Sequence, residues 1–374
     1  SSGLSPFWEA ITRPTLVINE AKVRRNITRM AEKARSSGVR FRPHFKTHQS
    51  AALGEWFRAE GVTAITVSSV AMAGYFADCG WEDITIAFPV NWREIETINA
   101  LAARVRLGLL IDSVETARFV AQRLDYPADA WLDVDTGYYR TGVDWEDDAT
   151  AVTIGAALSG SRLTPRGLLT HAGHSYGERT ATGVLAIYDE TVHRLTHLRQ
   201  RLANAGYTAL VLSIGDTPCC ALVEDLHAVD EIRPGNFPYF DMMQVEIGSC
   251  SLDDVAAVVA CPIVSRYPAR QHVVIYGGGV HLSKESIIDH LGRKNFGFIA
   301  LPTREGWEAL PEGSYVLSLS QEHGVLQVDG DVFDRFQIGD LALIMPVHSC
   351  MSADLLKSGV ILPSGQRFSM MPYL

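Results

Sequence analysis

One lysine near the start of the chain has the surroundings of a nucleophile. Residues 42–48 read RPHFKTH, which places Lys46 beside an apolar residue and between two histidines, at the end of an expected buried strand. A lysine among such neighbours can lose its proton near neutral pH and then attack an aldehyde. From this heptapeptide alone, a surface lysine at a strand end is an equally good interpretation. The other motifs must decide between the two.

Further polar motifs follow the ends of other predicted strands. They read DTGYYRTG at residues 135–142, HAGHSYG at 171–177, SIGDTP at 213–218 and RPGN at 233–236. The last two combine glycine with polar residues, a composition that lets backbone N–H groups approach a phosphate. Each motif by itself also fits a turn, a surface loop or a pair of core histidines. All of them nevertheless fall where a barrel builds its active site, at the carboxyl ends of its strands.

The elements that must position these motifs are strands and helices in regular alternation. Asn19 can cap a helix that ends near Gly38, and its apolar residues share one face, namely Val23, Ile27, Met30 and Ala34. Eight short apolar runs then occur, each followed by a helical pattern, at residues 39–46, 64–68, 83–88, 104–111, 130–135, 166–171, 209–214 and 231–236. Continuous apolar strands separated by helices indicate parallel strands that are buried on both faces.

The pattern predicts an α/β fold with an N-terminal (β/α)8 TIM-like barrel at residues 20–250. An open doubly wound sheet is the alternative, but the glycine-rich turn expected after its first strand is missing. After residue 250 the segments become short, strand-like and separated by Gly, Pro and Asp. We therefore expect a C-terminal, mainly β domain at residues 251–374, which residues 1–19 join.

Composition excludes several classes of function. The 374 residues carry a net charge of −10, with 43 acidic and 33 basic residues and no basic run of the kind that binds nucleic acid. No stretch is long and apolar enough to span a membrane, and the start lacks the features of a signal peptide. The six cysteines form no CxxC pair. We expect a cytoplasmic protein with neither a nucleic-acid nor a membrane partner.

Taken together and in order along nearly the whole chain, these motifs resemble the D-serine dehydratase and D-threonine aldolase family. This family belongs to the alanine-racemase-like class of pyridoxal-phosphate enzymes, which have a barrel followed by a β domain and are commonly homodimers. The resemblance implies that Lys46 carries pyridoxal 5'-phosphate as a Schiff base and that Arg140 contacts the phenolic oxygen of its ring. The further cofactor contacts that it implies are His171 near the ring and Tyr176, Gly215, Thr217, Gly235 and Asn236.

A second constellation lies near the C-terminus, where residues 346–350 read PVHSC. On an extended chain, His348 and Cys350 point to the same side and can share one zinc ion, although HxC alone is weak evidence. The resemblance strengthens it, because a His-x-Cys pair here is similar to the zinc site of the dehydratases, whereas the aldolases typically resemble His-x-Asp. Thiolate suits Zn2+, and carboxylate suits Mn2+ or Mg2+. We therefore expect Zn2+, with another divalent metal as the alternative.

The resulting hypothesis is a lyase that dehydrates a β-hydroxy D-amino acid, such as D-serine or D-threo-3-hydroxyaspartate, to a 2-keto acid and ammonia. Lys46 would remove the Cα proton, and the metal would stabilise the departing hydroxyl. The alternative is a metal-dependent D-threonine aldolase that yields glycine and an aldehyde, with His174 as a candidate base. An amino-acid racemase and a non-catalytic pyridoxal-phosphate carrier are further alternatives. Val347 and residues 275–281 depart from the family pattern.

Overall fold

A computed structural model describes residues 4–310 and 312–373 of the chain. The chain divides into two compact units, of which one comprises residues 28–46 and 53–237 and the other comprises the remaining described residues. The segment 47–52, which directly follows Lys46, belongs to the second unit. The domain limits expected above, at residues 19 and 250, stay a prediction.

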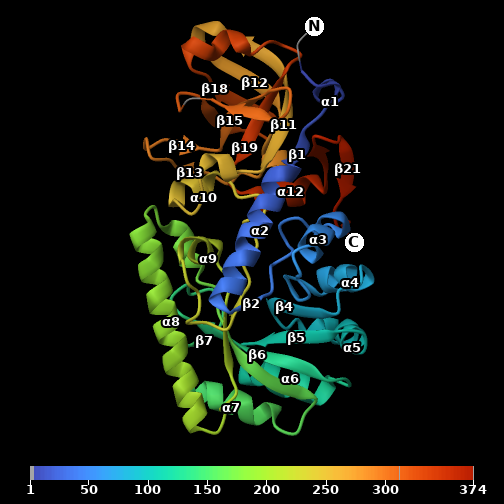
Figure 1. Cartoon of the computed structure of the whole chain (residues 1–374), viewed down its shortest axis with the longest axis vertical. Coiled ribbons are helices and arrows are strands. Elements are labelled where there is room, and N and C mark those ends of the chain that lie inside the picture. Colours follow the sequence, from blue (N-terminus) through green and yellow to red (C-terminus); the bar gives the residue numbers. More distant parts are fainter. Residues whose placement is uncertain (1–3, 311, 374) are drawn as a thin grey trace. The chain divides into compact units, whose positions relative to one another are not determined.

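The first unit is a nearly closed barrel of eight parallel strands surrounded by helices (Figure 1). In spatial order the strands are β2 (Arg40–Phe41), β10 (Glu231–Ile232), β9 (Val211–Ile214), β8 (Leu163–Leu169), β6 (Ala128–Asp135), β5 (Arg106–Ile111), β4 (Asp83–Pro89) and β3 (Ile65–Val67). A parallel bridge between His44 and Thr66 joins the two ends of this order. The short β7 (Val143–Asp144) pairs with β6 alone. The predicted barrel is therefore confirmed.

The helices follow the strands as the alternating pattern predicted. They are α2 (Glu20–Ser37), α3 (Ala51–Arg58), α4 (Val70–Asp78), α5 (Ile95–Ala102), α6 (Val114–Arg123), α7 (Asp148–Leu158), α8 (Ala181–Asn204) and α9 (Thr217–Leu222). The cap predicted for the first of them is present, because the Asn19 side chain accepts a hydrogen bond from the backbone N–H of Lys22 at 3.0 Å. Gly38 ends the helix with a φ of +67°, a conformation that costs glycine little.

Two barrel strands are much shorter than their apolar runs suggested. The runs at residues 39–46 and 231–236 each contain a proline, and the regular pairing ends at Phe41 and Ile232, before Pro43 and Pro234. Proline has no N–H to donate to a sheet. The regular pairing therefore ends early on both strands, although the backbone N–H groups of Arg42 and His44 still donate to the carbonyls of Ile232 and Pro234 at 3.0 Å and keep the two segments side by side. The residues beyond the prolines are available to line the rim.

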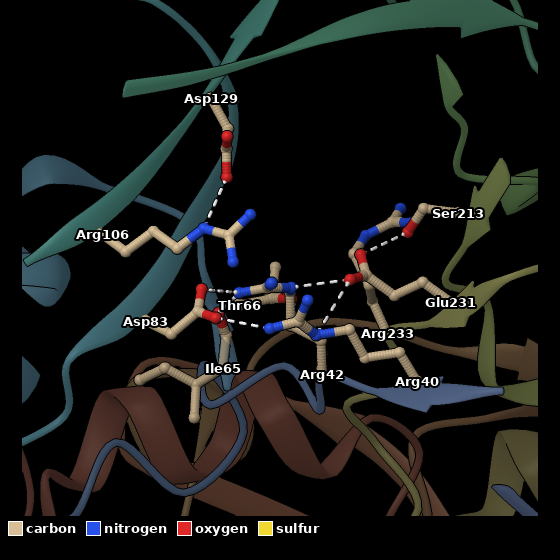
Figure 2. A network of polar contacts seen from close by, with 10 residues as sticks. All are labelled: Arg40, Arg42, Ile65, Thr66, Asp83, Arg106, Asp129, Ser213, Glu231 and Arg233. Atoms are coloured by element: carbon tan, nitrogen blue, oxygen red, sulfur yellow. Dashed lines mark hydrogen bonds and ion pairs between the residues drawn. The ribbon is translucent and has the colours of Figure 1, made fainter. Parts of the chain in front are cut away.

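A network of buried charges crosses the barrel between β2, β4, β9 and β10 (Figure 2). Glu231 accepts hydrogen bonds from Arg42 Nε at 2.9 Å and from Ser213 Oγ at 2.7 Å. Arg42 Nη1 also donates to Asp83 at 2.7 Å, and Arg233 Nη1 donates to Ser213 at 2.7 Å. Glu231 thus pairs directly with Arg42, lies 3.9 Å from Arg40 Nε, and reaches Arg233 through the Ser213 hydroxyl.

The Glu231→Gln variant is expected to lower the free energy of unfolding by about 3 kcal/mol, because the Arg42 side chain is only 3% exposed and would be left with the partly exposed Asp83 as its acidic partner. The measurement is urea-induced unfolding. The control is Asp148→Asn, which removes an ion pair whose Arg201 side chain is 53% exposed, and it should change stability by less than about 1 kcal/mol. Equal effects of the two substitutions would contradict the argument.

The second unit is a mainly antiparallel sheet (Figure 1), which confirms the predicted β domain. Its main order is β12 (His272–Tyr276), β18 (His323–Gln327), β17 (Tyr315–Leu319), β15 (Gly297–Pro302), β19 (Leu341–Pro346), β11 (Ala257–Tyr267), β1 (Thr15–Asn19), β20 (Ser358–Leu362) and β21 (Gln366–Ser369). The edge strand β16 (Trp307–Ala309) pairs with β15, and β13 (Ile287–Ile288) with β14 (Lys294–Asn295) forms a separate hairpin. The N-terminal strand β1 is antiparallel to β11 and parallel to β20.

The short helices that accompany this sheet in the described part of the chain are α1 (Pro6–Glu9), α10 (Met242–Ile247), α11 (Gly279–Leu282) and α12 (Ser349–Leu356). Among the helices of the described residues, none has the length and apolar character needed to cross a membrane.

Candidate active site

Lys46 is held at the barrel rim by the residue that precedes it. Phe45 is buried and packs against three aromatic rings whose centroids lie 4.8–5.0 Å away, those of Phe57, Phe76 and Trp81. The anchored Phe45 fixes the backbone of a turn on which the Lys46 side chain is exposed. The backbone N–H of Lys46 also donates to His44 Nδ1 at 3.3 Å. The sequence prediction of a strand up to Lys46 is thus wrong in detail, because the lysine lies on this turn.

His171 follows β8 and is surrounded by positive charge. Burial lowers the pKa of its imidazole well below the ordinary value, and the nearby charges of Lys46, Arg140 and Arg233 lower it further. The imidazole is therefore neutral at physiological pH. Its ring centroid lies 6.0 Å from that of Tyr176. The positive charges of Lys46, Arg140 and Arg233, together with the rings of His171 and Tyr176, suit a ligand that is anionic and aromatic.

Hydrogen-bond donors converge where β8, β9 and β10 end. The hydroxyl of Tyr176 lies 3.4 Å from the backbone N–H of Thr217, and the Thr217 hydroxyl accepts from the backbone N–H of Asn236 at 3.2 Å. Two glycines permit this approach. A Cβ at Gly215 would lie 2.8 Å from the Arg233 side chain, and one at Gly235 would lie 2.9 Å from the Cβ of His44. Backbone amides and hydroxyl groups that meet beside cations have the chemistry of a phosphate site.

The barrel unit therefore fits pyridoxal phosphate. The predicted contacts all lie in the segments that follow β8, β9 and β10, and they are His171, Tyr176, Gly215, Thr217, Gly235 and Asn236. Arg140 is exposed on the loop after β6, where its guanidinium carbon lies 5.1 Å from the centre of the Tyr138 ring. Its charge nevertheless contributes to the field at His171. The assignment of individual residues to atoms of the cofactor stays a prediction.

One carboxylate in the barrel was missed by the sequence analysis. Asp133 lies on β6, and its Oδ2 atom is buried with no hydrogen-bond partner among the described residues. Burial raises the pKa of Asp133 to about 6, although a hydrogen bond from Thr141 opposes the shift. The strand at residues 130–135 was predicted from the sequence, but a predicted strand does not reveal that one oxygen of its carboxylate lacks a partner.

The pKa of Asp133 predicts a pH dependence of stability. Its ordinary value is about 3.9, so between about pH 4 and pH 6 the folded protein holds a proton that the unfolded chain has released. The contribution of Asp133 to stability therefore falls as pH rises through this window. At neutral pH, Asp133→Asn should be more stable than the unmodified protein by on the order of 2–3 kcal/mol, and this advantage should vanish near pH 4. Urea unfolding at both pH values measures it, and a constant difference would contradict it.

His348 and Cys350 come together at the start of a helix. Strand β19 ends at Pro346, His348 is the N-cap of α12, and Cys350 lies in the first turn of that helix. The expectation that an extended chain aligns the two side chains is therefore wrong. Asp241 fixes the turn instead, because its Oδ2 accepts from the backbone N–H of Ser349 at 2.9 Å. The imidazole of His348 still hydrogen-bonds the side chain of Cys350.

The surroundings of this pair suit a cation. His348 Nδ1 lies 2.6 Å from Glu285 Oε2, and Cys350 Sγ lies 3.0 Å from the hydroxyl of Thr47. Burial alone would lower the pKa of His348, but Cys350 and Glu285 outweigh it and raise the pKa to about 11.

The buried hydroxyl of Tyr239 has no hydrogen-bond partner among the described residues. Burial raises the pKa of that hydroxyl, and the nearby Cys350 raises it further.

A soft nitrogen and sulfur donor pair in a negative environment is the donor set that Zn2+ prefers. No group of three or more His, Cys, Asp or Glu residues that could hold a metal occurs within the described ranges. The pair would therefore supply two ligands and leave positions for water or substrate. Thr47 and Glu285 were not singled out by the sequence analysis, because neither is near the HxC motif in the chain.

Comparisons with known proteins give the family. Residues 18–242 match the family model described as alanine racemase, N-terminal domain, and residues 256–362 match the model described as putative serine dehydratase domain. The chain belongs to the D-serine dehydratase family of alanine-racemase-like proteins. The predicted family is therefore confirmed, as is an enzyme of this type. The D-serine dehydratase family depends on pyridoxal phosphate, and the identity of the metal stays a prediction.

Three proteins illustrate the similarity. D-threo-3-hydroxyaspartate dehydratase from Delftia sp. is 30% identical over 348 residues, which are 90% of this chain and 90% of that protein. Its solved structure has a TM-score of 0.90 and covers 98% of this chain and 99% of that chain. D-serine dehydratase from Dictyostelium discoideum is 28% identical over 92% of this chain and 91% of that protein. D-threonine aldolase from Filomicrobium marinum, at 22% identity and a TM-score of 0.82 over 97% and 96% of the two chains, shares the fold.

Proposed function

We propose that this protein is a pyridoxal-phosphate- and zinc-dependent dehydratase that converts a β-hydroxy D-amino acid into a 2-keto acid and ammonia. The observation that carries the proposal is the hydrogen bond between the side chains of His348 and Cys350. The thiol of Cys350 also contacts the hydroxyl of Thr47, the residue that follows Lys46 in the chain. D-serine and D-threo-3-hydroxyaspartate are the candidate substrates, because the relatives are named for dehydration of these compounds.

Two solved mutant structures titled D-threo-3-hydroxyaspartate dehydratase support the metal pair. One is a mutant with a cysteine replaced by alanine, in the metal-free form, and another has a histidine replaced by alanine. The two mutated residues are two positions apart in that protein, which is the spacing of His348 and Cys350 here. We propose that His348 and Cys350 hold the corresponding metal in this chain.

The residues of the barrel would bind and orient the substrate. Pyridoxal phosphate, when bound, supplies an electron sink for negative charge at the substrate Cα. Lys46 would anchor it covalently until the substrate amine replaces the lysine, and the freed Nζ would then take the proton from Cα. The amides and hydroxyls of Thr217, Tyr176 and Asn236 would hold the phosphate, and the neutral His171 would lie against the ring. His348 and Cys350 would hold the ion that polarises the β-hydroxyl.

The chemical softness of Cys350 favours elimination over aldol cleavage, because a carboxylate at this position would suit the harder Mn2+ or Mg2+. The test is to incubate the protein with pyridoxal phosphate, Zn2+ and D-serine, D-threonine or D-threo-3-hydroxyaspartate, with and without EDTA. We expect keto acid and ammonia, lost with the chelator and restored by zinc. Glycine with an aldehyde would instead make the protein an aldolase. Racemisation that chelators leave unchanged would make it a racemase, and no turnover would favour a cofactor carrier.

By the same resemblance, we propose that the protein acts in the cytoplasm as a homodimer on a small D-amino acid. Light scattering coupled to size-exclusion chromatography tests the oligomeric state, and a mass of one chain would contradict it.

A further inference from the structure

Three consecutive glycines, at residues 277–279, precede the segment that contacts His348. The backbone N–H of Gly277 donates to the carbonyl of Glu322 at 3.0 Å, and that of Gly279 donates to the carbonyl of Ser320 at 2.8 Å. A Cβ at Gly278 would lie only 2.4 Å from the carbonyl oxygen of Gln321. The two backbone segments are thus in contact without side chains between them, and this contact fixes the start of α11.

The segment after α11 is tied to the helix that His348 caps. The carbonyl of Leu282 accepts a hydrogen bond from Ser352 Oγ of α12 at 3.0 Å. Ser283 then adopts a φ of +64°, and its hydroxyl accepts from the backbone N–H of Glu285 at 3.3 Å. The backbone that carries Glu285 is therefore constrained, because Glu285 lies three residues after Leu282, which is hydrogen-bonded to α12.

The contact that results is between Glu285 Oε2 and His348 Nδ1, at 2.6 Å. Carboxylate oxygens accept hydrogen bonds, so this contact places a proton on Nδ1 of His348. A metal that displaces the other proton of the ring would then bind at Nε2. The side chains of His348 and Glu285 are 28% and 40% exposed, so packing does not enclose the imidazole ring completely. The hydrogen bond to the Glu285 carboxylate restricts rotation of the ring.

We propose that Glu285 is a positioning residue for the metal pair, which holds the His348 ring with Nε2 available to an ion shared with Cys350. The inference rests on the proposed function, since it assumes that the pair binds a metal. Carboxylates that hold a metal-binding histidine in this way typically change metal affinity by about 10- to 100-fold when they are removed.

The test is the affinity of the purified full-length protein for Co2+ and Zn2+, measured in competition with a chromophoric chelator at one pH. Glu285→Gln is expected to bind both ions about 10- to 100-fold more weakly. The absorption band of thiolate bound to Co2+ should also change in position or intensity. The matched control is Glu305→Gln, at an exposed position of the same unit, which should leave affinity and band unchanged.

A second readout separates positioning from a structural role. The metal-free Glu285→Gln variant should melt within a few degrees of the metal-free unmodified protein, whereas the rise in melting temperature on adding Zn2+ should be smaller. If Glu285→Gln had the metal affinity and the Co2+ band of the unmodified protein, the role of Glu285 would be refuted, while the proposed function would stand. If the unmodified protein and Cys350→Ala bind Co2+ equally weakly, the proposed function fails, and this inference fails with it.

Discussion

Replacing Lys46 with alanine is expected to lower the rate of keto acid and ammonia formation by at least roughly 10²- to 10⁴-fold, because one amine would serve both as the covalent anchor and as the proton acceptor. The visible absorption of the lysine-bound cofactor should disappear as well. Stopped assays of keto acid and an absorption spectrum measure the two effects. No other side chain that we assign to the barrel rim supplies a primary amine.

The control for this prediction is Lys294→Ala, at an exposed lysine on β14. That variant should keep both the rate and the spectrum of the unmodified protein. If Lys46→Ala retained more than about a tenth of the activity, the assignment of the nucleophile would be wrong, since loss of a positioned base alone costs more than that.

Replacing Cys350 with alanine is expected to release the metal and to lower the rate of elimination by about 10³-fold, because a Lewis acid at the leaving hydroxyl contributes several kcal/mol. Metal content by mass spectrometry and keto acid formation measure the two effects. Cys79→Ala, at a half-buried thiol of the barrel unit, should retain both.

The Cys350→Asp variant tests whether Cys350 sets the choice of metal. A carboxylate is a harder ligand than a thiolate, so this variant should bind Mn2+ better relative to Zn2+ than the unmodified protein does. A variant that still prefers zinc to the same degree would show that Cys350 does not decide the choice of metal. Glycine formation by the unmodified protein would show that the cysteine is no marker of elimination.

The order of strands and helices could be predicted because each element is specified by residues close together in the chain. Buried parallel strands need continuous apolar runs, and all eight runs of the barrel were visible as such. The helix between Asn19 and Gly38 could be placed because its cap, its apolar face and its final glycine are local signals. Motifs at the ends of successive strands then had to meet at one rim.

The partners of the site residues could not be predicted in the same way, because they come from distant parts of the chain. The sequence determined that Lys46 follows the first barrel strand and that a histidine and a cysteine lie two apart. Only the tertiary structure decided that Thr47 meets Cys350 across 303 positions and that Glu285 meets His348 across 63. Those contacts depend on how strands and loops pack against one another. Packing is set by all the buried side chains together, so no single segment of the sequence reveals it.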